Sequence, residues 1–155
     1  MDVDLLIVGA GMAGLTAGAR AVRDGLSVLV VEIGPDVGGS ARFAGYAWTA
    51  PSHEIMDQQN PHGDPALKRA LVDGFADGIS WIRSIGVEAK DAQPILSFGR
   101  GHQFDTNHYL DTCRRRNVTE GYTCGATASK SSKRACSTVR FRRAARTARC
   151  KPSSR

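Results

Sequence analysis

The apolar positions in the first part of the chain form two short runs separated by an alanine-rich stretch. The first run covers residues 3–8 and the second covers residues 27–31. Short runs of Val, Leu and Ile bounded by glycine or polar residues predict buried strands, and residues 15–24 between them predict a helix. Two strands joined by a helix form a βαβ unit with parallel strands. The pattern therefore predicts an α/β fold with a Rossmann-like parallel sheet and flanking helices.

A glycine fingerprint fills the turn between the first strand and the helix, Gly9-Ala10-Gly11-Met12-Ala13-Gly14. Gly9 permits the tight turn, Gly11 lets backbone approach a pyrophosphate, and Gly14 lets the helix pack closely on the strands. Glu32 ends the second strand, where it is expected to accept hydrogen bonds from a ribose and to repel a 2′-phosphate. This arrangement is typical of dinucleotide-binding domains. An ordinary βαβ turn, with glycines that serve packing alone, is the alternative.

A second glycine-rich segment follows the acid, at residues 38–40. Gly38 and Gly39 allow a second close approach of backbone to a dinucleotide, and Ser40 is predicted to cap a short helix directed at the same pyrophosphate. This segment favours a flavin dinucleotide over a nicotinamide one. A glycine-rich turn without a ligand is the alternative.

A helix is predicted over residues 64–86. Asp64 suits the N-cap, Pro65 the first helical position and Gly86 the residue after the C-terminus. Trp81 is interpreted as a core residue. The predicted apolar face consists of Leu67, Leu71, Phe75, Ile79, Ile82 and Ile85.

Two further elements are predicted after this helix. Residues 94–98 form a candidate strand, and Asp105 or Thr106 is expected to cap a last helix that includes a small buried residue, Cys113. The spacing of the four histidines indicates no metal site, and no Ser-His-Asp arrangement can be argued. These histidines are His53, His62, His102 and His108.

In the order and spacing of its motifs, the chain resembles the flavoprotein subunits of fumarate reductase and succinate dehydrogenase, with ketosteroid dehydrogenases as relatives. The resemblance extends from residue 1 to about residue 116. The matching pieces are residues 8–15, 31–35, 38–40, 47–49, 63–67, 79–82, 85–87 and 101–103.

The resemblance implies FAD as the cofactor and an oxidoreductase that acts on activated C–C bonds, of which this chain is an N-terminal fragment that is inactive alone. The family often has a glycine pair where this chain has Ala44-Gly45-Tyr46. Its catalytic residues lie downstream of the matched segment, so none is placed here; His102 has a family counterpart near the flavin. Carried over by position, the cofactor-binding residues are Gly9, Gly11, Met12, Ala13, Gly14, Glu32, Ile33, Gly39, Ser40, Ala41 and Gly45.

The chain changes composition near residue 114. Residues 114–155 carry a net charge of +12 and contain no Leu or Ile, whereas residues 1–113 carry −6. We therefore predict a partial FAD-binding domain over residues 1–116 and a disordered basic tail of low complexity over residues 117–155. Three interpretations of the tail stay open: an arm that binds nucleic acid or an anionic surface, a zinc or disulfide module, and the product of a shifted reading frame.

Partners and location follow from the same observations. FAD and a small-molecule substrate are expected, with nucleic acid only if the tail is a natural protein segment. No stretch of 18 apolar residues predicts a membrane span, and the start of the chain lacks the basic region of a secretory signal, so a cytoplasmic location is predicted. A nicotinamide-dependent reductase fragment is one alternative function. A non-enzymatic nucleotide-fold protein with a nucleic-acid-binding tail is the other.

Overall fold

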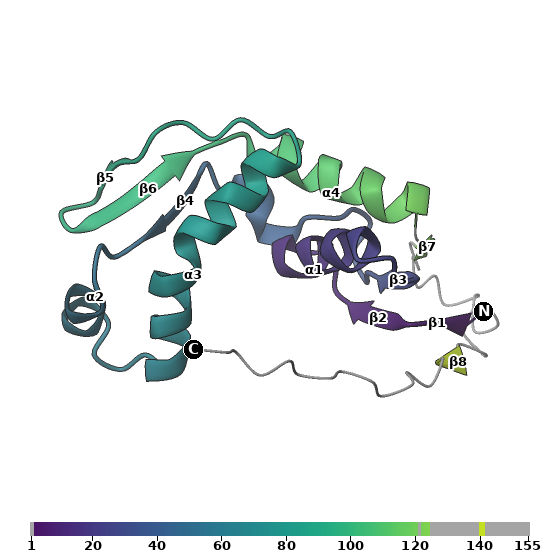
Figure 1. The fold of residues 1–155 in the computed structure, drawn as a ribbon, viewed down its shortest axis with the longest axis horizontal. Helices are drawn as coiled ribbons and strands as arrows, with labels where there is room; N and C mark the ends of the chain where they lie inside the picture. Colours follow the sequence, from purple (N-terminus) through teal and green to yellow (C-terminus); the bar gives the residue numbers. More distant parts are fainter. Residues whose placement is uncertain (1, 121, 125–139, 142–155) are drawn as a thin grey trace, which may run out of the picture.

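The predicted βαβ unit is confirmed in a computed structural model, which describes residues 2–120, 122–124 and 140–141 (Figure 1). Strand β2 (Leu5–Val8) leads into helix α1 (Met12–Arg23), which returns to strand β3 (Val28–Val31). The two strands pair in parallel, with Leu5 opposite Val28. Leu15, Ala19 and Val22 give α1 a buried face because they recur at helical spacing.

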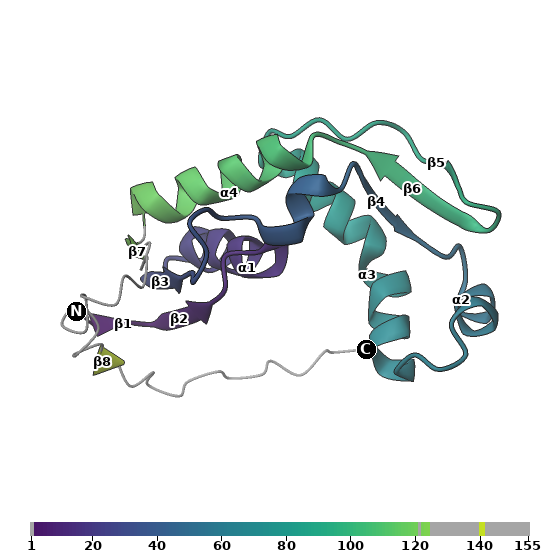
Figure 2. The same cartoon turned by 180° about the vertical axis from the view of Figure 1, so that it is seen from behind.

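A third strand extends this parallel sheet. Strand β7 (Tyr122–Cys124) pairs in parallel with β3, so the strand order is β2-β3-β7. Helix α4 (Thr106–Glu120) leads to β7 and lies against α1 on the same side of the strands (Figures 1 and 2). A separate pair of short strands, β1 (Asp2–Val3) and β8 (Arg140–Phe141), is also parallel. Within the described residues, the sheet is Rossmann-like but incomplete, because only β7 accompanies the two strands of the βαβ unit.

The predicted boundary between domain and tail, near residue 116, falls inside α4. Asn117 is 1% exposed, and its Nδ2 donates hydrogen bonds to the carbonyl oxygens of Leu15 and Cys113. Asp105, one of the two predicted caps, lies just before α4 and caps it, since its carboxylate accepts from the His108 N–H at 2.9 Å. Most of the predicted tail, residues 125–139 and 142–155, lies outside the described residues, so its disorder stays a prediction.

Helix α3 (Pro65–Ser84) confirms the caps predicted from the sequence. The Asp64 carboxylate accepts from the N–H groups of Ala66 and Leu67 at 2.8 and 3.0 Å. Gly86 adopts φ +87°, the left-handed conformation that favours glycine after a helix.

The predicted apolar face of α3 is only partly correct. Ile79, Ile82 and Ile85 are buried, but Leu67 and Leu71 are 72% and 49% exposed. A helix of 20 residues is about 30 Å long, and only the second half of α3 reaches the core formed with α1 and α4. The first half packs instead beside helix α2 (His53–Gln59), where Lys68 Nζ lies 2.5 Å from Asp57 Oδ1.

A small antiparallel sheet lies beyond α3 in the order β4-β6-β5 (Figure 1). It consists of β4 (Tyr46–Thr49), β5 (Gln93–Ile95) and β6 (Gly99–Gln103). The predicted strand over residues 94–98 is therefore wrong in its bounds, because Leu96, at φ +55°, begins the turn into β6. Glycines make room for Trp48 here: a Cβ on Gly101 would lie 2.7 Å from the Trp48 Cβ.

A chain of polar contacts joins α1, α3 and α4 inside the core. Thr16 Oγ1 donates to the carbonyl of Met12 at 2.6 Å, so it accepts from the Tyr109 hydroxyl at 2.7 Å. Trp81 Nε1 donates to the same Tyr109 oxygen at 3.2 Å. Trp81 is packed against the core, as predicted, and Cys113 is fully buried.

Tyr109 should ionise late in the folded protein. Burial raises its pKa to about 12 from an ordinary value of 10.0. Because the fold favours the neutral phenol, this stabilisation is complete below pH 10 and is lost as the pH rises from 10 to about 12. We expect ultraviolet titration to show a late-ionising tyrosine that disappears in Tyr109→Phe and persists in the control Tyr46→Phe. Ionisation of Tyr109 at its ordinary pKa of 10.0 in the folded protein would contradict the packing described above.

Among the residues that the structure describes, no helix combines the length and the apolar character needed to cross a membrane.

Candidate dinucleotide-binding site

The fingerprint turn gives each glycine a separate role. Gly9 adopts φ +99°, and its N–H donates to the carbonyl of Val31 at 2.7 Å. At Gly14 a Cβ would lie only 2.0 Å from the carbonyl oxygen of Gly9, so only glycine lets α1 approach the turn this closely. At Gly11 a Cβ would meet nothing within 4 Å. The space beside Gly11 is therefore open, which a pyrophosphate approaching the backbone requires.

The first turn of α1 is open to an anion. Gly11 is its N-cap, no side-chain hydrogen bond caps the turn, and no acidic residue lies in it. The N–H groups at the start of a helix lack intrahelical partners, and the helix dipole places partial positive charge there. A phosphate group is the ligand that such a helix start binds in dinucleotide folds.

Glu32 lies beside this turn and is held by backbone. Its Oε2 accepts from the Ala10 N–H at 2.6 Å, and its Oε1 accepts from the Gly34 N–H at 2.7 Å. The hydrogen bond from Gly34, followed by that from Ala10, lowers the pKa of the Glu32 carboxyl below its ordinary value. The group is therefore ionised at neutral pH. Each carboxylate oxygen keeps a lone pair that can accept from a ribose hydroxyl. The negative charge opposes a phosphate on the ribose 2′ position.

The second glycine segment is joined directly to the fingerprint. The Gly38 N–H donates to the carbonyl of Ala10 at 2.7 Å, and Gly11 and Gly38 form a parallel β-bridge. Two glycine segments that are far apart in the sequence thus lie side by side, and their backbones face the same open space. The 3-10 helix η1 (Gly39–Phe43) starts from this bridge.

The prediction that Ser40 caps this short helix is wrong. The cap position belongs to Gly38, at φ +104°, and no side-chain hydrogen bond caps the turn. Ser40 lies one residue inside η1 and is exposed. The reason is that the positive φ of Gly38 turns the chain into the helix earlier than the sequence suggested.

The structure places most of the predicted cofactor-binding residues in one region. Ile33 follows β3, directly after Glu32 in the chain, and is 87% exposed. Gly45 lies apart, just before β4, where its carbonyl accepts from the Phe104 N–H at 3.3 Å; no described contact joins it to the fingerprint. The residues that lie together are Gly9, Gly11, Met12, Ala13 and Gly14 at the turn, Glu32 beside it, and Gly39, Ser40 and Ala41 on η1.

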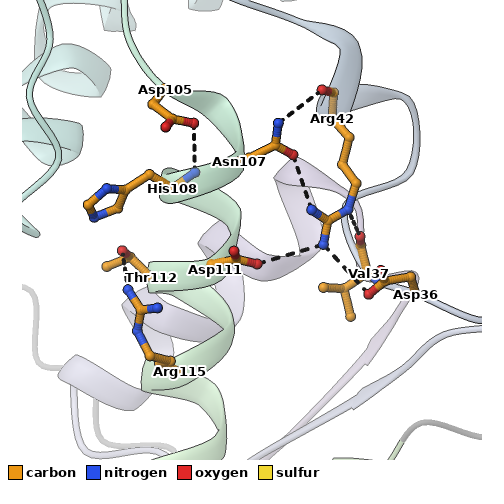
Figure 3. Close-up of polar contacts among 9 residues, drawn as sticks. All are labelled: Asp36, Val37, Arg42, Asp105, Asn107, His108, Asp111, Thr112 and Arg115. Carbon is orange, nitrogen blue, oxygen red and sulfur yellow. Dashed lines mark hydrogen bonds and ion pairs between the residues drawn. The ribbon is translucent and has the colours of Figure 1, made fainter.

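Sequence reasoning missed the residue that ties the second glycine segment to the rest of the fold. The Arg42 guanidinium contacts both the loop before it and helix α4 (Figure 3). Its α4 partner Asn107 lies 65 positions away in the sequence. An arginine near a glycine pair gives no signal in a single sequence that could have revealed this contact.

The other chemistry-bearing groups lie away from the fingerprint. His102 is on β6, where its Nδ1 lies 2.7 Å from the carbonyl of Lys90. The described residues contain no group of three or more His, Cys, Asp or Glu side chains that could hold a metal ion. A cavity of about 540 Å³ lies between the end of α3, β6 and the start of α4, and no predicted site residue lines it. Its polar lining consists of Glu88, Lys90, Gln103, Asp105 and His108.

Known proteins resemble the part of this chain that contains the fingerprint. Residues 7–61 match the NAD(P)-binding Rossmann-like domain family. A fumarate reductase (cytochrome) from Shewanella frigidimarina is 31% identical over 120 residues, covering 65% of this chain and 21% of that protein. A 3-oxosteroid 1-dehydrogenase from Mycobacterium tuberculosis is 32% identical over 102 residues, covering 65% of this chain and 18% of that protein. The chain thus spans about a fifth of the length of these relatives.

Solved structures share the fold. The open conformation of a flavocytochrome c3 fumarate reductase superposes with a TM-score of 0.67 at 21% identity, covering 79% of this chain and 26% of that one. A 3-ketosteroid-Δ4-(5α)-dehydrogenase from Rhodococcus jostii gives a TM-score of 0.62 at 16% identity, covering 79% and 38%. The fingerprint turn, the sequence relatives and the shared fold agree. The N-terminal part of this chain is similar in sequence to fumarate reductases and 3-oxosteroid dehydrogenases and shares the fold of the solved structures.

Proposed function

We propose that the described part of the chain is an FAD-binding module of an oxidoreductase that acts on activated C–C bonds. One observation carries the choice of FAD: the second glycine segment is bridged to the fingerprint through Gly11 and Gly38. A second backbone segment beside the pyrophosphate position suits a ligand that extends past it. This is the reason to favour a flavin over a nicotinamide dinucleotide.

The residues fit the proposed cofactor. The open space at Gly11 and the uncapped first turn of α1 would receive the pyrophosphate, with Met12, Ala13 and Gly14 supplying backbone. The Glu32 carboxylate would accept the adenosine ribose hydroxyls. Gly39, Ser40 and Ala41 would lie along the phosphate and ribityl region, and nothing lies within 4 Å of a Cβ position on Gly39.

The chemistry belongs to the cofactor, and this chain's residues hold it. When bound, a flavin exchanges a hydride with a carbon of a substrate C–C bond adjacent to a carbonyl or carboxylate. The residues described here would orient the dinucleotide through backbone N–H groups and exclude a 2′-phosphate through Glu32. No described residue is assigned the role of substrate ligand or proton donor. The small-molecule substrate and the cytoplasmic location stay predictions, and nucleic-acid binding would depend on the basic tail, most of which lies outside the described residues.

Titration of the full chain with dinucleotides tests the cofactor. FAD, followed by its fluorescence, is expected to bind more tightly than NADPH by about tenfold or more, because the ionised Glu32 opposes the 2′-phosphate. NADH, which differs from NADPH only by that phosphate, serves as the internal comparison and should bind more tightly than NADPH.

The variant Glu32→Gln isolates the charge. It should bring the affinities for NADH and NADPH close together, since the neutral amide no longer repels a phosphate. Tighter binding of NADPH than of FAD by the unaltered chain would refute the flavin assignment. Equal affinities of the unaltered chain for NADH and NADPH would show that Glu32 does not contact the ribose.

A further inference from the structure

Arg42 connects the second glycine segment to helix α4 through four polar contacts of its guanidinium (Figure 3). On the loop side, its Nε donates to the carbonyl of Val37 at 2.6 Å, and its Nη2 lies 3.6 Å from Asp36 Oδ1. On the α4 side, its Nη1 donates to Asn107 Oδ1 at 3.1 Å, and its Nη2 lies 3.7 Å from Asp111 Oδ1. The side chain is 27% exposed, so these contacts are partly shielded from solvent.

Gly38 lies directly against this side chain. A Cβ on Gly38 would come within 2.9 Å of both the Arg42 Cγ and the Leu110 Cδ1, and Leu110 is fully buried on α4. On its other side, the Gly38 N–H donates to the carbonyl of Ala10. The glycine segment is therefore held between the fingerprint turn and a surface made by Arg42 and α4.

The charges around Arg42 distinguish a positioning role from direct phosphate binding. Two carboxylates, Asp36 and Asp111, already face the guanidinium, and its remaining described contacts are a carbonyl and an amide oxygen. A phosphate approaching the same group would meet both carboxylates. The guanidinium is thus used by the protein itself, in the planar multidentate manner that a lysine ammonium cannot reproduce.

We propose that Arg42 is a positioning residue for the dinucleotide site: it fixes the Gly38–Gly39 backbone against the fingerprint by anchoring it to α4. The inference rests on the proposed function, since it concerns the same site. Arg42 acts through the backbone that it holds and does not touch the cofactor. Asn107 and Asp111 are its anchors on α4.

The test compares FAD with AMP in the full chain. AMP would occupy only the fingerprint and Glu32, whereas FAD would also extend along Gly39–Ala41. Arg42→Gln should therefore weaken FAD binding by about tenfold and change AMP binding by less than about twofold. Arg42→Lys should resemble Arg42→Gln, because charge without the planar fork cannot make these contacts. Arg100→Gln, an exposed arginine on β6, is the matched control and should bind both ligands normally.

Several outcomes would overturn the inference. They are unchanged FAD affinity in Arg42→Gln, full rescue by Arg42→Lys, or an equal loss of FAD and AMP binding, which indicates general destabilisation. If Arg42→Gln does not fold, Asp111→Asn, which removes one ion pair on the α4 side, should still weaken FAD relative to AMP by about threefold. Failure of the unaltered chain to bind FAD would instead refute the proposed function, so the two failures are distinguishable.

Discussion

Replacing Gly14 with alanine is expected to destabilise the fold by about 2 kcal/mol or more, although alanine is the better helix former. The added Cβ would lie 2.0 Å from the carbonyl oxygen of Gly9, 3.1 Å from its carbonyl carbon and 3.2 Å from the Ile7 Cγ2. Two of these atoms are backbone and cannot rotate away. Helix α1 would have to move off β2, and its own buried Leu15 would lose packing in the core. Denaturant unfolding of both chains measures the effect.

Gly74→Ala provides the matched control. Gly74 lies in the interior of α3, and a Cβ there would meet nothing within 4 Å. The same chemical change should stabilise the protein by up to about 1 kcal/mol, because alanine loses less backbone entropy in a helix. If Gly14→Ala proved as stable as the unaltered chain, the close approach of α1 to the fingerprint turn would be wrong.

The parallel half of the fold was predictable because local signals and tertiary packing agree there. The apolar runs over residues 3–8 and 27–31 form β1, β2 and β3, and the caps Asp64 and Gly86 bound α3 as their chemistry requires. The tight turn at Gly9 and the close packing at Gly14 also followed from the spacing of the fingerprint. Each signal depends on residues within one turn or one βαβ unit, which a single sequence contains in full.

The antiparallel half was not predictable for a physical reason. Gly99 and Gly101 weaken the strand pattern of β6, since glycine in a strand usually indicates a loop or a close approach. Here the close approach is made by Trp48 on β4, about fifty positions earlier: its ring lies against the Cβ position of Gly99, and its Cβ lies against that of Gly101. The pairings of β4 and β5 with β6 explain these glycines, and the pairing with β4 is a long-range event.

The candidate site likewise has one part that the sequence predicts and one part that it does not. The fingerprint and Glu32 belong to one βαβ unit, so their proximity could be predicted. The placement of the second glycine segment depends on contacts between Arg42 and α4 across a large sequence separation. The exposure of Leu67 and Leu71 shows the related limit for α3, because periodicity identifies an apolar face without showing how far along the helix a partner extends.

Replacing Gly11 with valine should have the opposite effect to the change at Gly14: normal stability with loss of dinucleotide binding. Gly11 has φ −73° and ψ −175°, an extended conformation that valine readily adopts. A Cβ at this position would meet no atom within 4 Å, so the fold has room for it. That same room is what a pyrophosphate would occupy at the start of α1. A branched side chain there would exclude the phosphates without disturbing the core.

The expected result is a fall in FAD affinity of at least about tenfold, or about 1.4 kcal/mol, with an unfolding midpoint close to that of the unaltered chain. Titration by flavin fluorescence and denaturant unfolding on the same preparation separate the two quantities. Paired with Gly14→Ala, this variant distinguishes the glycine that the ligand needs from the glycine that the fold needs. A folded Gly11→Val chain that binds FAD as tightly as the unaltered one would show that the fingerprint is only a structural turn. In that case the proposed pyrophosphate position, and with it the inferred role of Arg42, would have to be abandoned.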